Sequence, residues 1–116
     1  MAKDDYPVLV AKILVFLYRK LKGKTNEKAT DYIIPNTKDF PISEQYLSWV
    51  LKEMADKGLI RGFTSTRVWG GEDIMISGLN DIEITADGIE YLSSNSTIKK
   101  IIGMIPQAAS IAELFI

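Results

Sequence analysis

Two short stretches decide the fold, Lys57-Gly58-Leu59-Ile60-Arg61-Gly62 and Ile84-Thr85-Ala86-Asp87-Gly88-Ile89-Glu90-Tyr91-Leu92. In the first, Gly58 ends a helix and an extended segment follows. In the second, Thr85 comes directly after a strand and is a suitable N-cap for a short helix over residues 86–92. The two stretches therefore predict strands that enter and leave a ribbon, with a helix on either side of it.

The residues between these stretches predict a β-hairpin. Residues 59–68 are rich in threonine, isoleucine, phenylalanine and valine, which favour strands. Gly70-Gly71 suits a tight turn, because two glycines tolerate the positive φ that a hairpin loop needs. A two-residue loop would pair Arg67 with Ile74 and Trp69 with Glu72. The later run Ile82-Glu83-Ile84 alternates as a half-buried strand does.

Upstream, a helix is predicted over residues 6–22, with Asp4 or Asp5 as its N-cap and Pro7 in its first turn. Gly23 is the expected residue after its end. One apolar face comprises Val10, Ile13, Leu14, Leu17 and Leu21, and a second comprises Leu9, Val15 and Phe16. A helix that is apolar on two sides must be covered on two sides.

A second clear helix is predicted over residues 43–57, capped by Ser43 and stopped by Gly58. Its buried stripe is Leu47, Val50, Leu51 and Met54, and its outward face carries Gln45, Ser48, Trp49, Lys52, Glu53 and Asp56. Between the two helices, we expect a short strand over residues 32–34 and one helical turn over residues 36–40. The prolines at 35 and 41 limit the length of both predicted elements.

After the 86–92 helix, a last helix is predicted from Ser96 or Thr97, with a bend at Pro106. One side of it carries Ile98, Ile101, Ile102, Ile105, Ala109 and Ala112. We expect this helix to cover the second apolar face of the 6–22 helix.

Helix, short helix, longer helix, β-hairpin and capped helix is the element order of a winged helix-turn-helix domain. The run over residues 57–62, together with the Thr-x-x-Gly-x-x-Tyr-Leu unit at 85–92, resembles the YjcQ family of small bacterial and phage proteins. The resemblance covers about residues 8–105. It implies an α+β, mostly α, winged-helix fold with a β-hairpin wing and an extra C-terminal helix, and it implies no particular activity.

Length and composition favour binding over catalysis. A chain of 116 residues is expected to form a single domain over residues 1–116, with its core at about 6–95 and its C-terminal helix at about 97–115. It contains no cysteine and no histidine, which excludes thiolate zinc sites and every nucleophile arrangement built on histidine. We therefore expect no enzyme activity, no cofactor, no metal and no small-molecule substrate. The acidic pairs Asp4-Asp5 and Glu72-Asp73 are interpreted as solvated.

The apolar run over residues 8–18 is too short to cross a bilayer, and no signal peptide is visible. The sequence therefore predicts a cytoplasmic protein that makes no membrane contact.

Double-stranded DNA is the first candidate partner, because a winged helix often places its third helix in the major groove. The candidate contacts are Gln45, Ser48, Trp49 and Lys52 on that helix, Arg67 on the wing, and Lys20 and Lys22 at the end of the first helix. The charge pattern argues against this reading. The formal net charge is −1, and Glu44, Glu53 and Asp56 share the helix with Lys52.

The alternative is a protein-interaction or dimerisation module that keeps the winged-helix fold without binding DNA. Trp49 and Trp69 are candidate interface anchors, since interfaces favour tryptophan. The apolar tail is a candidate homodimer interface through Ile111, Leu114, Phe115 and Ile116.

Overall fold

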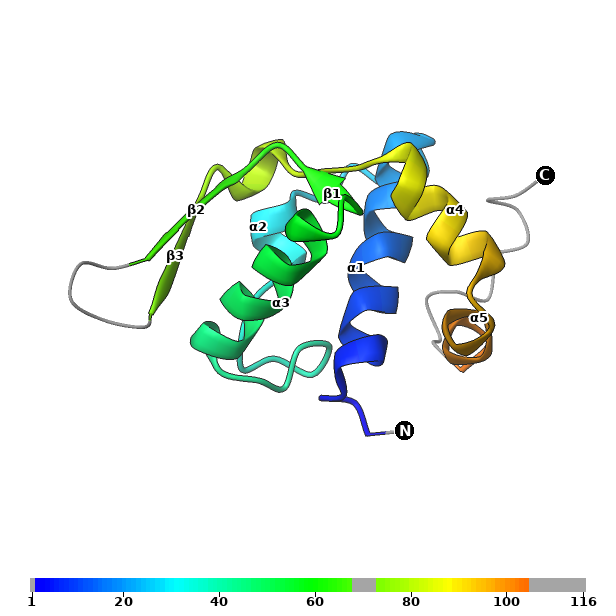
Figure 1. The fold of residues 1–116 in the computed structure, drawn as a ribbon, viewed down its shortest axis with the longest axis horizontal. Helices are drawn as coiled ribbons and strands as arrows, with labels where there is room; N and C mark the ends of the chain where they lie inside the picture. Colours follow the sequence, from blue (N-terminus) through cyan, green and yellow to red (C-terminus); the bar gives the residue numbers. More distant parts are fainter. Residues whose placement is uncertain (1, 68–72, 105–116) are drawn as a thin grey trace.

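The computed structural model describes residues 2–67 and 73–104 and has an α+β, mostly helical, architecture that fits a winged helix (Figure 1). Its helices are α1 (Tyr6–Leu21), α2 (Ala29–Tyr32), α3 (Glu44–Asp56), α4 (Ala86–Ser94) and α5 (Ser96–Ile102). Its strands are β1 (Ile60–Arg61), β2 (Thr64–Arg67), β3 (Ile74–Ser77) and β4 (Glu83–Ile84), with the 3-10 turn η1 (Leu79–Asp81) before β4. The predicted fold class is confirmed.

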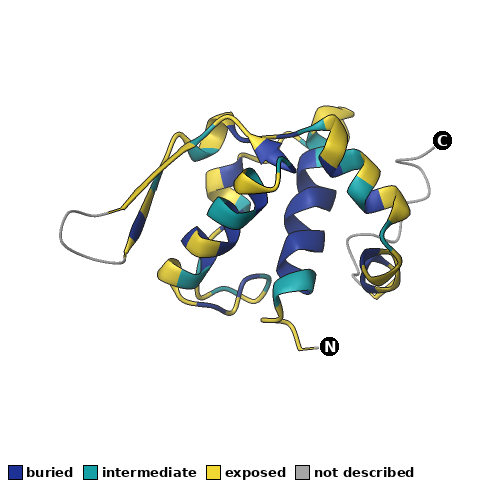
Figure 2. Cartoon of the chain, in the orientation of Figure 1, coloured by how far each residue is buried: buried dark blue, intermediate teal, exposed yellow. Residues whose placement is uncertain are grey.

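Helix α1 lies at the centre of the molecule, and every residue from Val8 to Leu17 is buried (Figure 2). It packs against α3 on one side and against α4 and α5 on another. The expected cover of its second apolar face is therefore confirmed, with Ile98, Ile101 and Ile102 of α5 buried. The prediction that Leu21 is buried is wrong. Its side chain is 59% exposed at the end of α1, where continuous burial stops after Leu17, and Gly23 follows with a φ of +74°.

The connection between α1 and α3 differs from the prediction. Residues 32–34 form no strand and residues 36–40 form no helical turn; the helical turn is α2, at Ala29–Tyr32. The Tyr32 ring stacks on Phe16 at 4.7 Å and meets the edge of Phe40 at 5.3 Å. Aromatic packing against α1 holds this segment, where backbone pairing had been expected.

The predicted strand over residues 59–68 is divided into two parts. β1 pairs with β4 near the core, and β2 pairs with β3 further out, so one long hairpin contains two short antiparallel ladders. The division falls at Gly62, whose φ is +100° and where a Cβ would collide with the backbone carbonyl of Asp81 in η1. The predicted pairing of Arg67 with Ile74 is confirmed. Trp69 and Glu72 lie outside the described residues.

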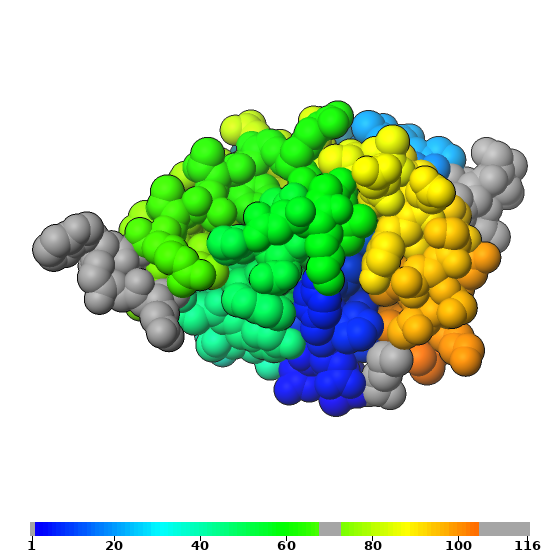
Figure 3. All heavy atoms as spheres, in the orientation of Figure 1, coloured from blue at the N-terminus to red at the C-terminus, as the bar shows by residue number. Residues whose placement is uncertain are grey.

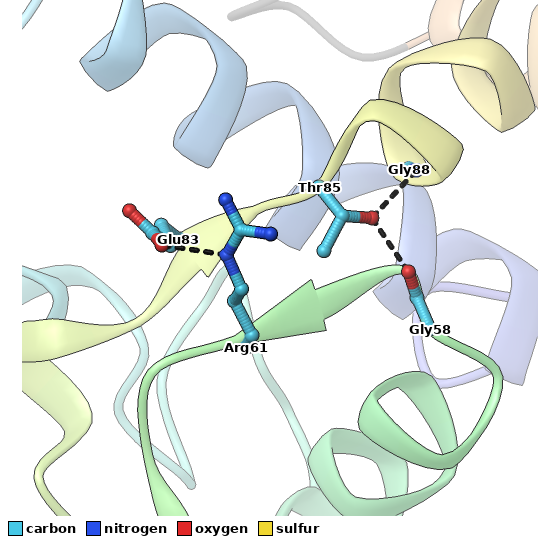
Figure 4. A network of polar contacts seen from close by, with 5 residues as sticks. All are labelled: Gly58, Arg61, Glu83, Thr85 and Gly88. Atoms are coloured by element: carbon cyan, nitrogen blue, oxygen red, sulfur yellow. Dashed lines mark hydrogen bonds and ion pairs between the residues drawn. The ribbon is translucent and has the colours of Figure 1, made fainter.

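The N-terminus of α4 is fixed to the end of α3 by Thr85 (Figure 4). The Thr85 hydroxyl accepts a hydrogen bond from the Gly88 N–H at 3.0 Å and donates one to the Gly58 carbonyl at 2.5 Å. A Cβ at Gly88 would collide with the Leu59 carbonyl and the Ile84 side chain. The predicted cap is therefore confirmed, and the base of the hairpin, α3 and α4 form one packed unit.

Helix α5 begins at Ser96, as predicted, and Asn95 caps it by accepting from the Ile98 N–H at 3.0 Å. The predicted bend at Pro106 and the predicted interface residues Ile111, Leu114, Phe115 and Ile116 lie outside the described residues.

Candidate binding surface

Helix α3 presents a narrow outward face. Ser43 caps it by accepting from the Tyr46 N–H at 3.2 Å, and its apolar stripe of Leu47, Val50, Leu51 and Met54 is buried as predicted. Gln45, Trp49, Lys52 and Asp56 recur at i, i+4, i+7 and i+11 on the opposite side. These four residues define the outward face of α3.

The hairpin covers one flank of α3. Two of the residues predicted to contact DNA, Gln45 and Ser48, lie on that flank. The Gln45 side-chain oxygen accepts a hydrogen bond from the Ile74 N–H of β3 at 3.1 Å. The prediction that Ser48 faces outward is wrong, because this residue is only 7% exposed on the flank that faces the hairpin. The helical period separates the two faces of α3, but it does not reveal that β3 lies against one of them.

Three of the predicted basic contacts, Lys52, Lys20 and Lys22, already interact with groups of the chain itself. Lys52 Nζ lies 2.6 Å from the Asp56 carboxylate, one turn along the same helix. Lys20 donates to the Glu27 carbonyl at 3.0 Å, and the Lys22 ammonium lies 5.5 Å from the Tyr18 ring centroid. Arg67 is exposed on β2.

Distance along α1 separates Lys20 from the outward face of α3. Tyr6 in the first turn contacts Trp49, whereas Lys20 lies fourteen residues further along the same helix. At 1.5 Å rise per residue, that is about 21 Å.

An aromatic cluster of Tyr6, Tyr46 and Trp49 joins the outward face of α3 to the first turn of α1. The Trp49 ring lies 5.6 Å from Tyr6, edge on, and 6.0 Å from Tyr46, stacked. The side chain of Trp49 remains 43% exposed. Figure 3 shows the start of α1 at the surface directly beside α3. Helical periodicity identified Trp49 on the outward face, but no sequence pattern pointed to Tyr6, which reaches Trp49 from the first turn of α1.

The charges around this cluster are mixed. The Lys57 ammonium lies 5.1 Å from the Tyr6 ring centroid. Burial raises the pKa of the Tyr46 hydroxyl, and the nearby carboxylates of Asp4 and Asp5 raise this pKa further. The cluster is thus an amphipathic surface without the excess of cations that phosphate binding requires.

A groove of about 460 Å³ runs between the β2–β3 hairpin and helices α2 and α3. Its apolar lining comprises Ile33, Pro35, Leu47, Leu51, Ile74, Met75, Ile76 and Leu79, and its polar lining comprises Thr30, Glu44, Gln45, Ser48 and Asp73. No sequence pattern indicates this groove, because its two walls are far apart in the chain.

One buried charge supports the fold beside these surfaces. Lys12, 8% exposed, donates from Nζ to the Asp39 backbone carbonyl at 2.6 Å and lies 6.0 Å from the Phe40 ring centroid. Burial lowers the pKa of its ammonium group, and the Asp39 carboxylate partly opposes that shift. Lys12 thus fastens the loop before α3 to α1.

Neither a metal-binding cluster nor a membrane-spanning helix is found in the described ranges. Across residues 2–67 and 73–104, no three acidic side chains come together as a metal site would require. None of the helices described there is long and apolar enough to cross a membrane.

Comparison with known protein families gives a match over most of the chain. The YjcQ protein family matches residues 12–109, which is most of the chain. No curated protein and no solved structure matches it. The matched region runs from within α1 to beyond α5 and includes the hairpin and the Thr85 cap. The chain therefore belongs to the YjcQ family.

Proposed function

We propose that this protein is a protein-interaction module that acts through the outward face of α3 and the adjoining aromatic cluster, and that it binds without catalysing a reaction. The observation that carries the proposal is the 43% exposed Trp49, held between Tyr6 and Tyr46. A tryptophan that is fixed by its neighbours loses little side-chain entropy on binding, and tryptophan is enriched among residues that dominate interface energies.

The polar groups nearby support a protein partner over a nucleic acid. Gln45 is engaged with the hairpin backbone, and Lys52 is paired with Asp56. A DNA-reading helix needs polar groups that reach base edges and cations that neutralise phosphates. An aromatic centre surrounded by mixed charges matches the usual pattern of protein interfaces, with an apolar core and a polar rim.

Site-specific cross-linking tests this proposal. A photo-reactive phenylalanine analogue at position 49 is expected to join the chain to a partner protein, or to a second copy of itself. The same analogue at the exposed Glu90 of α4 is the matched control. Products should disappear when Tyr6→Ala disrupts the cluster while position 49 keeps the analogue. Equal products from positions 49 and 90 would contradict the proposal.

A DNA-binding regulator, of phage or mobile-element type, is the second candidate. The observation that favours it is the β2–β3 hairpin beside α3, with Arg67 exposed on its outer strand. Titration with mixed-sequence duplex at two salt concentrations separates the two candidates. Binding by DNA contacts would weaken steeply with salt and would require Arg67. Absence of affinity at low salt would remove this candidate and leave the first one standing.

A further inference from the structure

We propose that the groove between the β2–β3 hairpin and helices α2 and α3 binds an extended peptide. The peptide pairs with the edge of β3 that faces away from β2, and it places a basic side chain beside Glu44 and Asp73. This site is separate from the exposed Trp49 ring, and the inference does not depend on the function proposed above.

The backbone of β3 has an edge to which a further strand could be added. Among the described residues, β3 pairs with β2 on one edge, in a two-stranded sheet, and with no strand on the other. In an antiparallel pair, alternate residues direct their N–H and C=O groups to opposite edges. The Ile74 N–H is directed away from β2, since it donates to Gln45. Ile76, two residues further, therefore directs its N–H and C=O to the same edge of β3, the one that faces away from β2.

Gln45 shows what this edge can bind. Its side-chain oxygen accepts from the Ile74 N–H at 3.1 Å, the place where the carbonyl of an added strand would lie. In the described part of the chain, no side chain fills the same role at Ile76. The edge is therefore half covered, and its remaining backbone groups match another backbone, as in β-strand addition.

The shape and lining of the groove suit the side chains of such a peptide. Its volume of about 460 Å³ lies within the range of ligand pockets, roughly 300–1,000 Å³. Apolar side chains from α3, β3 and the segment after α2 line it, among them Leu47, Ile76 and Ile33. Alternate side chains of an extended peptide project to one side, so those facing the groove would enter it while the backbone pairs with β3. A small apolar ligand would fill the groove but leave the β3 edge unpaired.

The charge of the groove favours a basic peptide. Among the described residues that line the groove, Glu44 and Asp73 are the charged ones, and both are acidic. Both flank the Gln45–Ile74 hydrogen bond in the sequence, so they lie at the same end of the groove. A lysine or arginine at that end of the peptide would be stabilised, whereas a phosphate backbone would be repelled.

Titration of the isotope-labelled full chain with a synthetic peptide tests the inference by NMR. The probe is acetyl-Lys-Val-Thr-Val-Thr-Val-amide, which alternates apolar and polar residues and carries one basic end. We expect shifted amide resonances from Ile74 to Gly78 and at the Gln45 side-chain amide. The backbone N-methylated peptide should bind at least about ten-fold more weakly, because it cannot form the strand hydrogen bonds.

Charge reversal supplies the matched variants. Glu44→Lys is expected to weaken binding of the probe roughly five-fold, while Glu53→Lys, the same change on α3 outside the groove, leaves it unchanged. Replacing the peptide lysine with glutamate should weaken binding of the natural chain and restore it partly in Glu44→Lys. This swap distinguishes a direct charge contact from damage to the fold.

Three outcomes would overturn the inference. Unchanged spectra at millimolar probe would show that Gln45 only protects a strand edge. Equal binding of the N-methylated peptide would show that the groove takes apolar chains without strand pairing. Shifts confined to the Trp49 and Tyr6 resonances would assign the peptide to the aromatic cluster, which contradicts the groove site and supports the proposed function.

Discussion

The base and the outer part of the hairpin use the same antiparallel pairing but are anchored in different ways. At the base, Ile60 and Ile84 face each other and are 2% and 4% exposed, with β4 on α1 and β1 on α3. In the outer part, all four residues of β2 are exposed (Figure 2). There β3 is attached to α3 through Ile74, by its buried side chain and its hydrogen bond to Gln45.

This difference assigns separate roles to one ribbon. The base belongs to the core, because its backbone is in close contact with α3 and α4 at Gly58, Thr85 and Gly88 (Figure 4). The outer part is a surface element that begins where Gly62 and η1 interrupt the ladder. A change at the base should therefore alter global stability, whereas a change in the outer part should alter local opening and binding.

The largest expected effect is at the base, at Gly88. The substitution Gly88→Ala places a methyl group against the Leu59 carbonyl and the Ile84 side chain, and backbone cannot move aside cheaply. We expect the free energy of unfolding to fall by about 2–3 kcal/mol, as in other overpacked sites. Urea denaturation followed by circular dichroism measures it. Gly103→Ala is the control, because a Cβ there makes ordinary contacts with the end of α5.

The next effect is at the hydroxyl that joins three elements. Thr85→Ala removes both the cap of α4 and the bond to the Gly58 carbonyl, and we expect a loss of about 1–2 kcal/mol. Thr85→Ser keeps both bonds and should recover most of that loss. Thr66→Ala, in the exposed outer strand, should cost about 0.5 kcal/mol or less. A larger loss at Thr66 than at Thr85 would reverse the proposed contrast.

A smaller and local effect is expected where the outer part meets α3. Gln45→Ala removes the acceptor of the Ile74 N–H, which is worth about 0.5–1 kcal/mol. Hydrogen exchange should accelerate at the Ile74 amide and remain unchanged at the Ile60 and Ile84 amides of the base. Gln45→Glu retains a side-chain oxygen and should retain slow exchange. Faster exchange throughout the domain would show that the outer part is needed for the core.

Short-range patterns predicted several features of the hairpin and of the helices beside it. The Thr85 cap, the pairing of Arg67 with Ile74, and the buried stripe of α3 each depend on spacings within one element or one turn. Such patterns act through local geometry, which the order of residues already contains. The resemblance to the YjcQ family rests on two short stretches, residues 57–62 and 85–92, and it is confirmed by the family match over residues 12–109.

Features that depend on contacts between distant residues were not predictable in this way. The break at Gly62 needs the Asp81 carbonyl, and the burial of Ser48 needs the hairpin at its flank. The aromatic cluster needs Tyr6 of α1 beside Trp49 of α3. Periodicity identifies which face of a helix is apolar, but tertiary packing decides which element covers it. The candidate surfaces therefore emerge only from the folded arrangement.

The smallest effect is expected at the Arg61–Glu83 ion pair of the base, and it tests what anchors that region. Arg61 Nε lies 2.7 Å from the Glu83 carboxylate, but their side chains are 66% and 54% exposed, so water and salt weaken the attraction. A double-mutant cycle with Arg61→Ala and Glu83→Ala should give a coupling of about 0.3 kcal/mol, near the median for exposed pairs. Close backbone contact at Gly88 would then account for most of the anchoring. A coupling above about 1.5 kcal/mol that falls in high salt would instead assign the anchoring of the base to charge.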